Sequence, residues 1–498
     1  MKELFTRRES RHPKRAAGLL MALVVFGQPL SPAVIVVDGG CSLADAITSA
    51  NTNSAVGGCT AGDSGPDSIQ LTENISLTSA LPVVTTDVTL EGGDFEIRRD
   101  DATPDFRILE FQGGADARLK NVTISNGRAD KGGAIYHDAN SLTLVNATLT
   151  GNESTGKGGG LYTGWDAFDT RLFSSTVSGN TSGTSGGGIY SGDYGDLILT
   201  ASTISDNVAG GRGGGIASGN YTSMRLINST VSGNLSGDEG GGINQGYGYL
   251  DVILENSTVI GNGAVGAVGG IFYDTFGPTD LILSNSTIAS NSGLNCLKPT
   301  PIDLGGNFDS DGSCGAPTVI PGVDFDLALA NNGGPTRTHK LLRDSVAIDA
   351  GVDCQHPKDQ RGFFRDLPCD SGAVEFGKAP VGGSIDGLTG RDVTCRNLGT
   401  GASVEFDLDG AESWDCEAEG LAVGIGDRLE LTLEARVADG AAGSVIGFSG
   451  RNAVCGNLTT GNLVTLSLVS TAAWNCETAG LSISPGDRLQ IVLTGSTP

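Results

Sequence analysis

The sequence has few large side chains. Aromatic residues make up 5% of its 498 residues, and it contains only three Met and three Trp. So few large side chains would hardly fill the core of a compact globule. A repetitive fold avoids this difficulty, because each of its repeats needs to pack only against its neighbours.

Helical patterning and basic charge are also scarce. No segment has an apolar stripe of helical length with a 3.6-residue period, and CSLADAITSAN, from Cys41, is the one plausible short helix. After the N-terminal segment no run of 18 apolar residues occurs, so no membrane-spanning helix is expected there. The chain has 57 Asp and Glu against 31 Lys and Arg, and this balance disfavours nucleic acid as a partner.

What the chain does have is 78 glycines and a short repeat. Thr followed by Ile, Val or Leu recurs at intervals of 25 to 29 residues, with the Thr at 123, 148, 176, 203, 230, 258 and 287. Short runs of Thr, Val, Ile and Leu, broken by Gly, Asn and Ser, are typical of strands. A fixed period of this length indicates a solenoid, and we predict a right-handed parallel β-helix over residues 69–330.

Asparagine and glycine recur at fixed places in this repeat. An Asn stands four residues after each Thr anchor from Thr148 onward, at 152, 180, 207, 234, 262 and 291. We expect these asparagines to occupy corners with left-handed backbone and to hydrogen-bond along the axis. Glycine runs predict a second corner where adjacent coils approach closely, at 132–133, 158–160, 186–188, 213–215, 240–242 and 269–270.

Residues 1–33 have the organisation of a secretory signal peptide. A basic head containing Arg7 and Arg8 precedes the apolar residues 16–27, and small residues follow at Ser31 and Ala33. The Arg pair leaves a twin-arginine route open, and a retained membrane anchor is the alternative. Removing the segment, with its six cations and two anions, changes the net charge from −26 to −30.

The ten cysteines all follow this segment and group as sequence neighbours. Their even number, their local spacing and the export signal predict five disulfide bonds: Cys41–Cys59, Cys296–Cys314, Cys354–Cys369, Cys395–Cys416 and Cys455–Cys476. Each bond is expected to contribute about 3 kcal/mol to stability. No Cys-x-x-Cys motif occurs, so a zinc site is not expected.

Two segments resemble families of bacterial surface proteins. CSLADA, from Cys41, resembles the CSLREA box, with Ala44-Asp45 in place of Arg-Glu, and residues 34–68 are expected to cap the first coil. NNGGPTRTHKLL, AIDAG, DQRG and CDSGAVEF, in that order over residues 331–376, resemble the choice-of-anchor Q region. That resemblance implies a C-terminal cap that closes a pectin-lyase-like β-helix, and the aspartates of the cap are expected to pair with its arginines.

The C-terminal part is a duplication that follows a linker at 377–381. Residues 383–434 align without a gap to 443–494, and each copy keeps two cysteines and one tryptophan. Short alternating strands in each copy predict two β-sandwich-like modules, at 382–439 and 440–498.

The tyrosines predict a binding face. All eight lie between residues 136 and 273, after the glycine corners, with aspartates interleaved. Because side chains alternate along a strand, the residue after each inward Ile or Leu is expected to point outward. Flat rings beside acceptors are typical of surfaces that bind sugars or proteins, and a stack that only protects the sheet is an equal alternative. The candidate ligand-binding residues are Tyr136, Tyr162, Trp165, Asp166, Tyr190, Asp193, Tyr194, Tyr221, Tyr247, Tyr249, Tyr273 and Asp274.

Catalysis and metal binding have weaker support. Three histidines follow the signal segment, His137, His339 and His356, and a Ser-His-Asp arrangement stays open without any nucleophile-elbow motif. Polysaccharide lyases and hydrolases, which the resemblance allows, need carboxylates and a base in one cleft, and no such set recurs along the repeat. DSDG at Asp309 begins like a calcium loop but has Ile320 at the twelfth position, so we expect no cofactor, with calcium as the alternative.

These features together predict a secreted protein, or one held at the outer surface of a bacterium. The expected function is adhesion or binding, with a polysaccharide or a cell-surface glycan or protein as the partner. The alternative is a polysaccharide lyase or hydrolase of the pectin-lyase-like class, and a third is a purely structural surface protein.

Overall fold

The computed structural model describes residues 32–165, 167–246, 250–273, 280–297, 301–315, 318–319, 325–342, 345–376, 382–407, 413–416, 421, 428–446, 449–467, 473–476, 479–484 and 487–496. All but the end of the expected signal peptide therefore lies outside the described residues. No helix within these ranges is long and apolar enough to cross a membrane.

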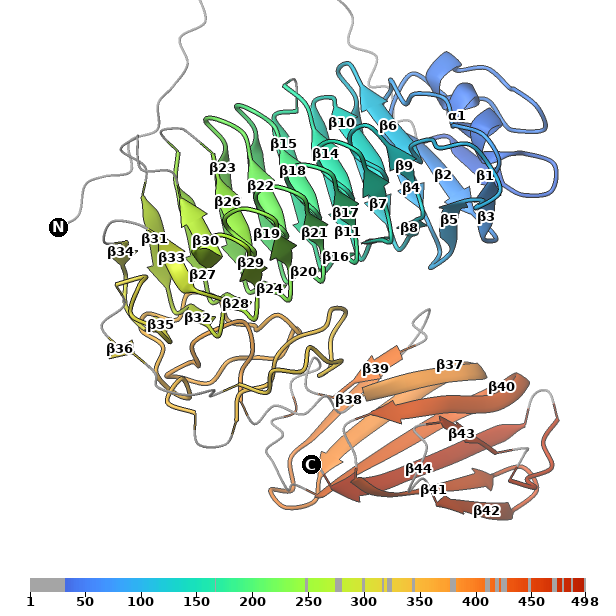
Figure 1. The fold of residues 1–498 in the computed structure, drawn as a ribbon. Helices are drawn as coiled ribbons and strands as arrows, with labels where there is room; N and C mark the ends of the chain where they lie inside the picture. The colour runs from blue at the N-terminus through green and yellow to red at the C-terminus, as the bar shows by residue number, and fades with distance from the viewer. Residues whose placement is uncertain are drawn as a thin grey trace, which may run out of the picture.

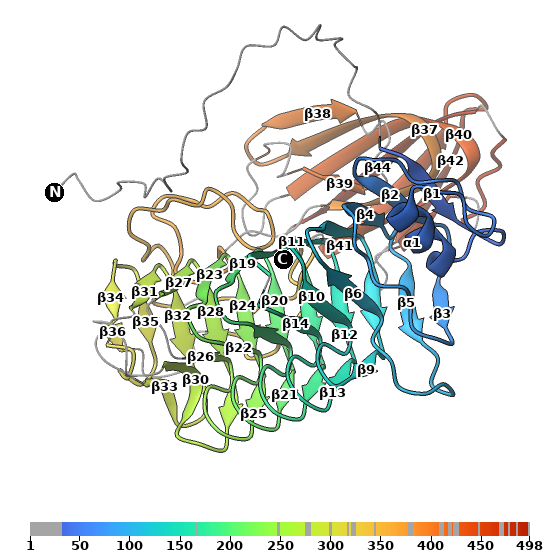
Figure 2. The same ribbon diagram turned by 90° about the horizontal axis from the view of Figure 1, so that it is seen from above.

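Parallel sheets wind into a β-helix, which confirms the predicted fold class (Figures 1 and 2). Each regular coil passes through four sheets, which we call walls 1 to 4 in the order in which the chain enters them. Wall 1 contains, from one end to the other, β1 (Val34–Val37), β2 (Asp67–Leu71), β4 (Val88–Glu91), β7 (Asp116–Lys120), β11 (Ser141–Val145), β15 (Asp169–Phe173), β19 (Asp196–Thr200), β23 (Ser223–Ile227), β27 (Val252–Glu255), β31 (Leu281–Ser284) and β34 (Ile302–Asp303).

Walls 2 and 3 follow wall 1 around each coil. Wall 2 contains β3 (Ile75–Leu77), β5 (Glu96–Arg99), β8 (Thr123–Ser125), β12 (Thr148–Thr150), β16 (Thr176–Ser178), β20 (Thr203–Ser205), β24 (Thr230–Ser232), β28 (Thr258–Ile260), β32 (Thr287–Ala289), β35 (Phe308–Asp309) and β36 (Thr318–Val319). Wall 3 is shorter and contains β9 (Arg128–Ala129), β13 (Glu153–Ser154), β17 (Thr181–Ser182), β21 (Val208–Ala209), β25 (Leu235–Ser236) and β29 (Gly263–Ala264).

Wall 4 completes the coil and carries most of the tyrosines. It contains β6 (Leu109–Gln112), β10 (Ile135–Asp138), β14 (Leu161–Thr163), β18 (Ile189–Ser191), β22 (Ile216–Ser218), β26 (Ile243–Gln245), β30 (Val268–Tyr273) and β33 (Leu294–Leu297). Equivalent residues pair in register from coil to coil, so one inward position gives a continuous apolar column. In wall 4 this column includes Ile135, Leu161, Ile189, Ile216, Ile243 and Ile271, all fully buried.

The asparagine column forms the predicted ladder, but with a different backbone. Each side-chain amide donates to the Oδ1 of the next Asn at 2.9–3.0 Å, from Asn152 through to Asn291. None of these asparagines has positive φ; the preceding residue takes that conformation instead, at Gly151, Gly179, Asp206, Gly233, Gly261 and Ser290. The prediction that these asparagines have left-handed backbone is therefore wrong by one position. The ladder needs each Asn side chain turned inward, where its buried amide finds hydrogen-bond partners.

The glycine corner behaves as predicted. A Cβ built on Gly159 would lie 2.3 Å from the carbonyl oxygen of Gly187, and one on Gly187 would lie 2.3 Å from that of Gly214. Real Cβ atoms do not approach backbone so closely, so this corner between walls 3 and 4 admits only glycine.

The N-terminal end is covered by the expected helix. α1 (Leu43–Thr52) begins after Ser42, whose hydroxyl accepts from the backbone N–H of Asp45 at 3.1 Å. Its buried face, with Leu43 and Ile47, joins the main apolar core, and α1 lies at the end of the row of strands in Figure 1. The parallel sheet itself already starts at β1, which pairs in register with β2.

Residues 325–342 and 345–376, which we call the flank segment, lie along the outer face of wall 2 instead of stacking on the last coil. Thr203 donates to the carbonyl oxygen of Arg337 at 2.6 Å, Thr230 donates to Gln360 at 2.6 Å, and the N–H of Ala373 donates to Thr258 at 3.0 Å. The strands beneath it, β20, β24, β28 and β32, have all three residues buried, whereas β12 and β16 alternate. The segment expected as a cap therefore covers one side of several coils.

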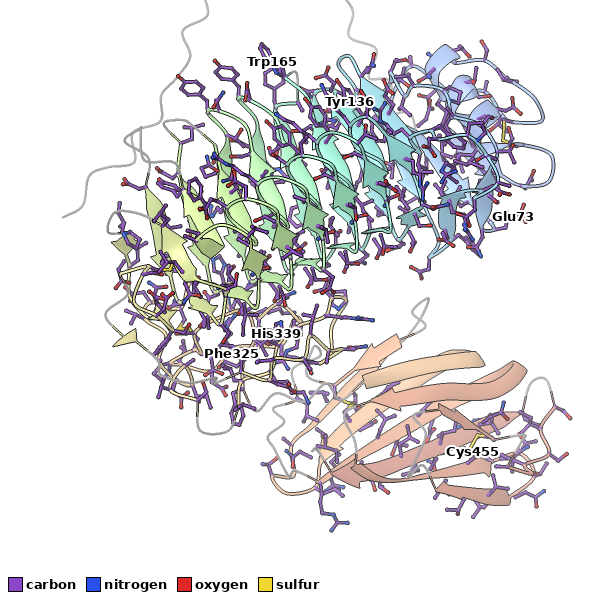
Figure 3. The ribbon with its side chains drawn as sticks, viewed as in Figure 1. Glu73, Tyr136, Trp165, Phe325, His339 and Cys455 are labelled. Atoms are coloured by element: carbon purple, nitrogen blue, oxygen red, sulfur yellow. A yellow bond between two sulfur atoms is a disulfide. The ribbon has the colours of Figure 1, made fainter. Side chains whose placement is uncertain are left out.

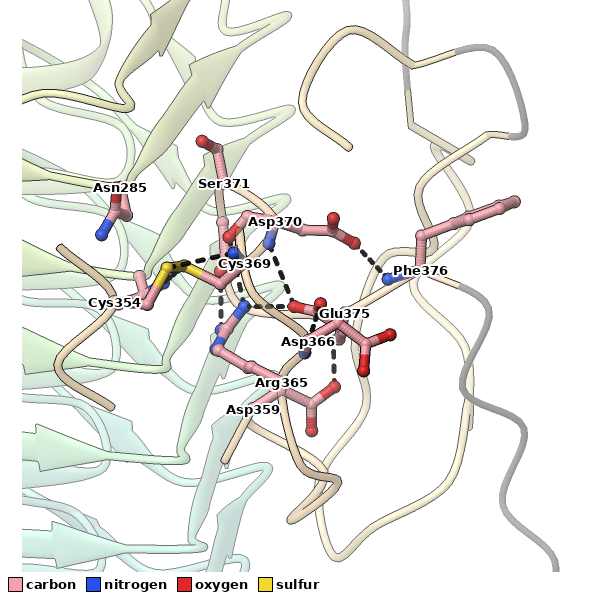
Figure 4. A network of polar contacts seen from close by, with 12 residues as sticks. Asn285, Cys354, Asp359, Arg365, Asp366, Cys369, Asp370, Ser371, Glu375 and Phe376 are labelled. Atoms are coloured by element: carbon pink, nitrogen blue, oxygen red, sulfur yellow. Dashed lines mark hydrogen bonds and ion pairs between the residues drawn. A yellow bond between two sulfur atoms is a disulfide. The ribbon is translucent and has the colours of Figure 1, made fainter. Parts of the chain in front are cut away.

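Buried charge pairs hold the flank segment together (Figure 4). Arg361 pairs with Asp359 at 2.6 Å, as expected from the sequence, but Arg365 pairs with Glu375 at 3.2 Å. Arg365 also donates to Asn228 of the β-helix at 3.0 Å. Burial, followed by the nearby Asp370 carboxylate, raises the pKa of Glu375 to about 7.

All five predicted disulfide bonds are present. The two copies of the C-terminal duplication contribute to one eight-stranded antiparallel sheet, which contains β37 (Gly382–Asn397), β38 (Ser403–Asp407), β39 (Ser413–Asp415), β40 (Arg428–Ile446), β41 (Ser449–Asn457), β42 (Asn462–Ser467), β43 (Ala473–Asn475) and β44 (Arg488–Ser496). β40 runs through the expected module boundary at 439–440 and pairs with both β37 and β44.

Candidate functional site

Three of the candidate tyrosines form a buried column on the outside of wall 4, which we call the tyrosine stack. Tyr136, Tyr162 and Tyr190 follow the inward residues of β10, β14 and β18 and pair in register. Their ring centroids are 5.2 and 5.5 Å apart, with interplanar angles of 21° and 6°. Tyr162 is 7% exposed and Tyr190 is 9% exposed, so the ring faces contact one another and are closed to a ligand.

A cation from the preceding coil covers each ring of the stack. The Arg107 guanidinium lies 4.7 Å from the Tyr136 centroid, and the Lys131 ammonium lies 5.0 Å from that of Tyr162. Lys157 lies 4.1 Å from the Tyr190 ring centre and donates to its hydroxyl at 2.7 Å. Burial raises the pKa of Tyr136 and of Tyr190 to about 12. Rings packed on one another and covered by cations are the geometry that the structural alternative for these residues predicts.

A second aromatic group, with three exposed rings and the half-buried Tyr221, stands at the rim between walls 4 and 1, and we call it the aromatic ridge. It consists of Trp165, Phe168, Tyr194 and Tyr221, from the equivalent loops of three successive coils. Trp165 is 69% exposed, Tyr194 62% and Phe168 60%, and Trp165 points away from the ribbon in Figure 3. The Tyr194 and Tyr221 rings stack on each other with centroids 5.1 Å apart at 6°.

The two tyrosines of the ridge have a strained backbone. Tyr194 has φ 66° and Tyr221 has φ 55°, in the left-handed region that bulky side chains rarely adopt. Each such residue costs about 1–2 kcal/mol relative to a residue that tolerates the conformation. Asn or Gly would fit these turns with less strain, and the Tyr194 ring is 62% exposed, so the choice of tyrosine there favours a role for the ring at the surface.

Carboxylates lie beside the ridge. Asp169 and Asp196 are paired in register on neighbouring strands, and Arg171 contacts Asp169 at 2.8 Å. Burial raises the pKa of Asp196, and the Asp169 charge raises it further. Asp193 accepts from the backbone N–H of Asn220 at 2.6 Å and so joins two loops of the ridge. The rim is therefore acidic as well as aromatic.

The remaining candidate residues do not join the ridge in the described structure. Tyr273 points inward and packs in the main core, because it lies two residues after the inward Ile271 on β30. Because side chains alternate between the two faces of a strand, the inward position of Tyr273 can be predicted from the sequence. Four candidates lie outside the described residues: Asp166, Tyr247, Tyr249 and Asp274.

A charged cleft of about 430 Å³ lies near the N-terminal end of wall 3. Asp105, Asp130 and Glu153 line it together with Arg107 and Arg128. Arg107 pairs with Asp130 at 3.2 Å, and Arg128 pairs with Glu153 at 3.4 Å. This convergence was not predicted from the sequence, because the lining residues come from three successive coils and their charges do not recur along the repeat.

The DSDG motif at Asp309 is used within the protein. Asp309 accepts from Asn295 at 2.8 Å and from the backbone N–H of Cys314 at 2.6 Å, and Asp311 accepts from the backbone N–H of Ser313 at 2.8 Å. Among the residues that the structure describes, no group of three or more His, Cys, Asp or Glu is placed to hold a metal ion.

Comparison with known proteins adds little. No protein-family model matches the chain, and no curated protein matches it. Among solved structures, the enzymatically active domain of tailspike protein 4 from bacteriophage CBA120 is similar at 12% sequence identity and a TM-score of 0.27, over 92% of this chain and 65% of that one. This chain thus matches about two thirds of the tailspike domain's length, and a similarity of this size transfers no activity to it.

Proposed function

We propose that the protein binds glycans through the aromatic ridge. The observation that carries this proposal is the exposure of Trp165, Phe168 and Tyr194 on successive coils, next to acceptor carboxylates. Aromatic rings offer a sugar a flat apolar surface at low entropic cost, and carboxylates accept hydrogen bonds from its hydroxyls. Repetition along the axis gives the ridge the extended form that suits a polymer.

Charge narrows the class of glycan. The chain carries a net charge of −26, and Asp169, Asp193 and Asp196 lie at the rim itself. A uronic acid polymer would bring like charge to this surface, whereas a neutral or amino-bearing sugar would not. We therefore propose neutral or amino-bearing oligosaccharides as the ligands.

The ridge can be tested without damaging the fold. Tyr194→Asn and Tyr221→Asn remove the rings and place at each position a residue that tolerates positive φ, so they keep or raise stability. Trp165→Ala removes the third ring. We expect an array of neutral, amino-bearing and uronate oligosaccharides to show binding to the first two classes, and calorimetric titration of the best ligand to show at least tenfold weaker binding for the triple variant.

A matched control separates ring stacking from general loss of apolar surface. Val265, between walls 3 and 4, is 80% exposed, and Val265→Ser removes an exposed apolar side chain far from the ridge in the coil. This variant is expected to bind as the parent does. Equal binding by the triple variant and the parent, with both folded, would remove the ridge from the proposal.

We further propose that the protein is exported as a member of the CSLREA and choice-of-anchor Q group of bacterial surface proteins. The five disulfide bonds support an oxidising location, and residues 331–342 and 345–376 support the second resemblance by forming a charge-paired segment that is docked on the β-helix. Fractionation of cells, with N-terminal mass analysis of the product, should find a mature chain outside the cytoplasm that begins near Val34. A full-length cytoplasmic chain with free thiols would contradict it.

Polysaccharide cleavage in the charged cleft is the second candidate function. The convergence of Asp105, Asp130 and Glu153 with two arginines is the observation that favours it. Each arginine is already paired with a carboxylate, however, and no free base is evident in that cleft among the described residues. Incubation with a polysaccharide panel, with and without calcium, decides the matter: new reducing or unsaturated ends that Asp130→Asn abolishes would favour an enzyme.

A further inference from the structure

A serine and a histidine meet beneath the flank segment, on wall 2 and apart from the aromatic ridge. Ser232 Oγ lies 2.7 Å from His339 Nε2, and His339 Nδ1 lies 2.8 Å from the backbone carbonyl oxygen of Asp326. A carbonyl oxygen can only accept, so Nδ1 carries the proton and Nε2 accepts from the Ser232 hydroxyl. Figure 3 labels His339 where the flank segment meets the coils.

This pair lines a pocket of about 370 Å³ between the coils and the flank segment. The corner residues Asp206, Gly233 and Gly261 form one side, and Leu327 with Leu329 forms the other. The Leu327 side chain is exposed and lines the pocket, so the pocket offers apolar surface next to the Ser232 hydroxyl. Its size suits a small acyl group.

The hydroxyl at position 232 is not required by the coil. The same outward position of wall 2 holds Ser178 and Ser205 on the preceding coils, but Ile260 and Ala289 on the following ones. The β-helix therefore accepts apolar side chains there. Among the described residues of this column, Ser232 is the one whose hydroxyl contacts a histidine.

We propose that Ser232 and His339 form a nucleophile and general base that hydrolyse small carboxylic esters in this pocket. In the acylation step Ser232 Oγ attacks the carbonyl carbon of the ester, and its proton passes to His339 Nε2. The bond to the alkoxy group breaks, and that group leaves as an alcohol with the proton from Nε2. Water, activated by the same nitrogen, then cleaves the acyl-serine to a carboxylic acid and restores the hydroxyl.

The surroundings of His339 suit this role. Burial lowers its pKa, so the ring is neutral and able to accept a proton at neutral pH. The carboxylates of Asp206 and Asp326 act on it in the opposite sense, and they favour the imidazolium that forms when the serine proton arrives. The Asp326 carbonyl holds the ring in the required tautomer, which is the function of the third member in other nucleophile–base arrangements.

The test uses the full-length protein with a fluorophosphonate probe and 4-nitrophenyl acetate. We expect one probe adduct per chain, located at Ser232 by peptide mass spectrometry, and ester hydrolysis that the adduct abolishes. Ser232→Ala should lose both the adduct and at least 100-fold in hydrolysis rate. It should keep the parent's melting temperature within a few degrees, because Ala289 occupies the same position two coils on.

Ser205→Ala is the matched control, since Ser205 occupies the same column one coil earlier. It is expected to keep the adduct and the activity of the parent. His339→Gln should lose hydrolysis while the β-helix, monitored by its circular dichroism, stays folded. Absence of any adduct at Ser232 in the parent, or equal hydrolysis by parent and Ser232→Ala, would overturn the proposal and leave glycan binding by the ridge unaffected.

Discussion

The tyrosine stack and the aromatic ridge use the same residue type on the same coils in opposite ways. Tyr190 in the stack and Tyr194 in the ridge are four residues apart, yet one is 9% exposed and the other 62%. Tyr190 lies on a strand with ordinary backbone, and Lys157 bonds to its hydroxyl. Tyr194 lies in a loop with positive φ. Position in the coil, not residue type, decides whether a ring stabilises the sheet or faces solvent.

The contrast between the stack and the ridge indicates which positions of the coil serve stability and which are free to serve function. A side chain on a wall is fixed by neighbours on both adjacent coils, so its removal is felt as lost packing. A side chain in a rim loop has few such neighbours, so it can be exchanged at little cost to stability. The ridge retains bulky rings in a strained conformation, and this fits the expectation that strain collects where function is under selection.

The largest effect on stability is expected from removing Tyr162, the middle ring of the stack. Tyr162→Ala leaves a gap between Tyr136 and Tyr190 and removes two ring contacts, so unfolding free energy should fall by about 3–4 kcal/mol. Denaturant titration measures this change. Glycan binding per folded molecule should be unchanged, and a selective loss of binding would place the stack in the binding surface after all.

A pH experiment probes the inward side of the same strand. His137 follows Tyr136 on β10, is fully buried, and its ring nitrogens have no hydrogen-bond partner among the described residues. Burial lowers its pKa to about 4, against smaller opposing effects of Asp138 and Asp169. As pH falls, His137 therefore takes up a proton in the unfolded chain before it does so in the folded one. The free energy of unfolding should fall by about 3 kcal/mol between pH 6.5 and pH 4 for this reason.

The comparison that isolates this effect is between the parent and His137→Leu at each pH. Glu375, whose pKa is raised to about 7, changes stability with pH in the opposite direction, but it does so equally in both proteins. The difference in unfolding free energy between them should widen in favour of the variant as pH falls from 7 to 4. A difference that stays constant over that range would contradict a neutral buried His137.

A smaller effect is expected from a single substitution in the ridge. Tyr194→Asn removes one exposed ring and its stacking on Tyr221, and glycan affinity should weaken about 10- to 30-fold, or about 1.5–2 kcal/mol. Because Asn tolerates positive φ, the melting temperature should stay level or rise. Calorimetric titration and a thermal melt on one preparation measure both quantities. A fall in both affinity and melting temperature would show that Tyr194 stabilises the fold, as the tyrosines of the stack do.

The smallest effect concerns the cations that cover the stack. Lys157→Met keeps an unbranched apolar side chain but removes the ammonium above Tyr190 and its hydrogen bond to the hydroxyl. We expect a loss of about 1 kcal/mol of stability, with no change in glycan binding. A matched substitution at the exposed Lys340 of the flank segment should cost nothing measurable.

Much of the β-helix is predictable because its signal is repeated. Seven Thr anchors and six Asn positions report the same coil, so a single irregularity does not obscure the period. Local spacing was also sufficient for the five disulfide bonds, including Cys354–Cys369. The fold and its covalent bonds thus follow from patterns that act over one coil.

Features that depend on neighbouring coils were harder to predict. Burial of Tyr162 depends on rings above and below it and on Lys131 from another coil, which no single repeat reveals. The place of the flank segment depends on contacts such as that of Arg337 with Thr203, 134 residues apart. The strain at Tyr194 likewise has no signature, because glycine or asparagine normally marks such a backbone.

The long reach of the flank segment also imposes an order on folding. Lys358 accepts through its carbonyl from Asn228, 130 residues earlier, so that hydrogen bond forms only after the intervening chain has been wound. In a chain synthesised from its amino end, the outward threonines of β20, β24 and β28 would have no partners in the flank segment until residues 325–376 had been made. Docking of the flank segment would then be a late, slow step, in which distant partners close over coils already laid down.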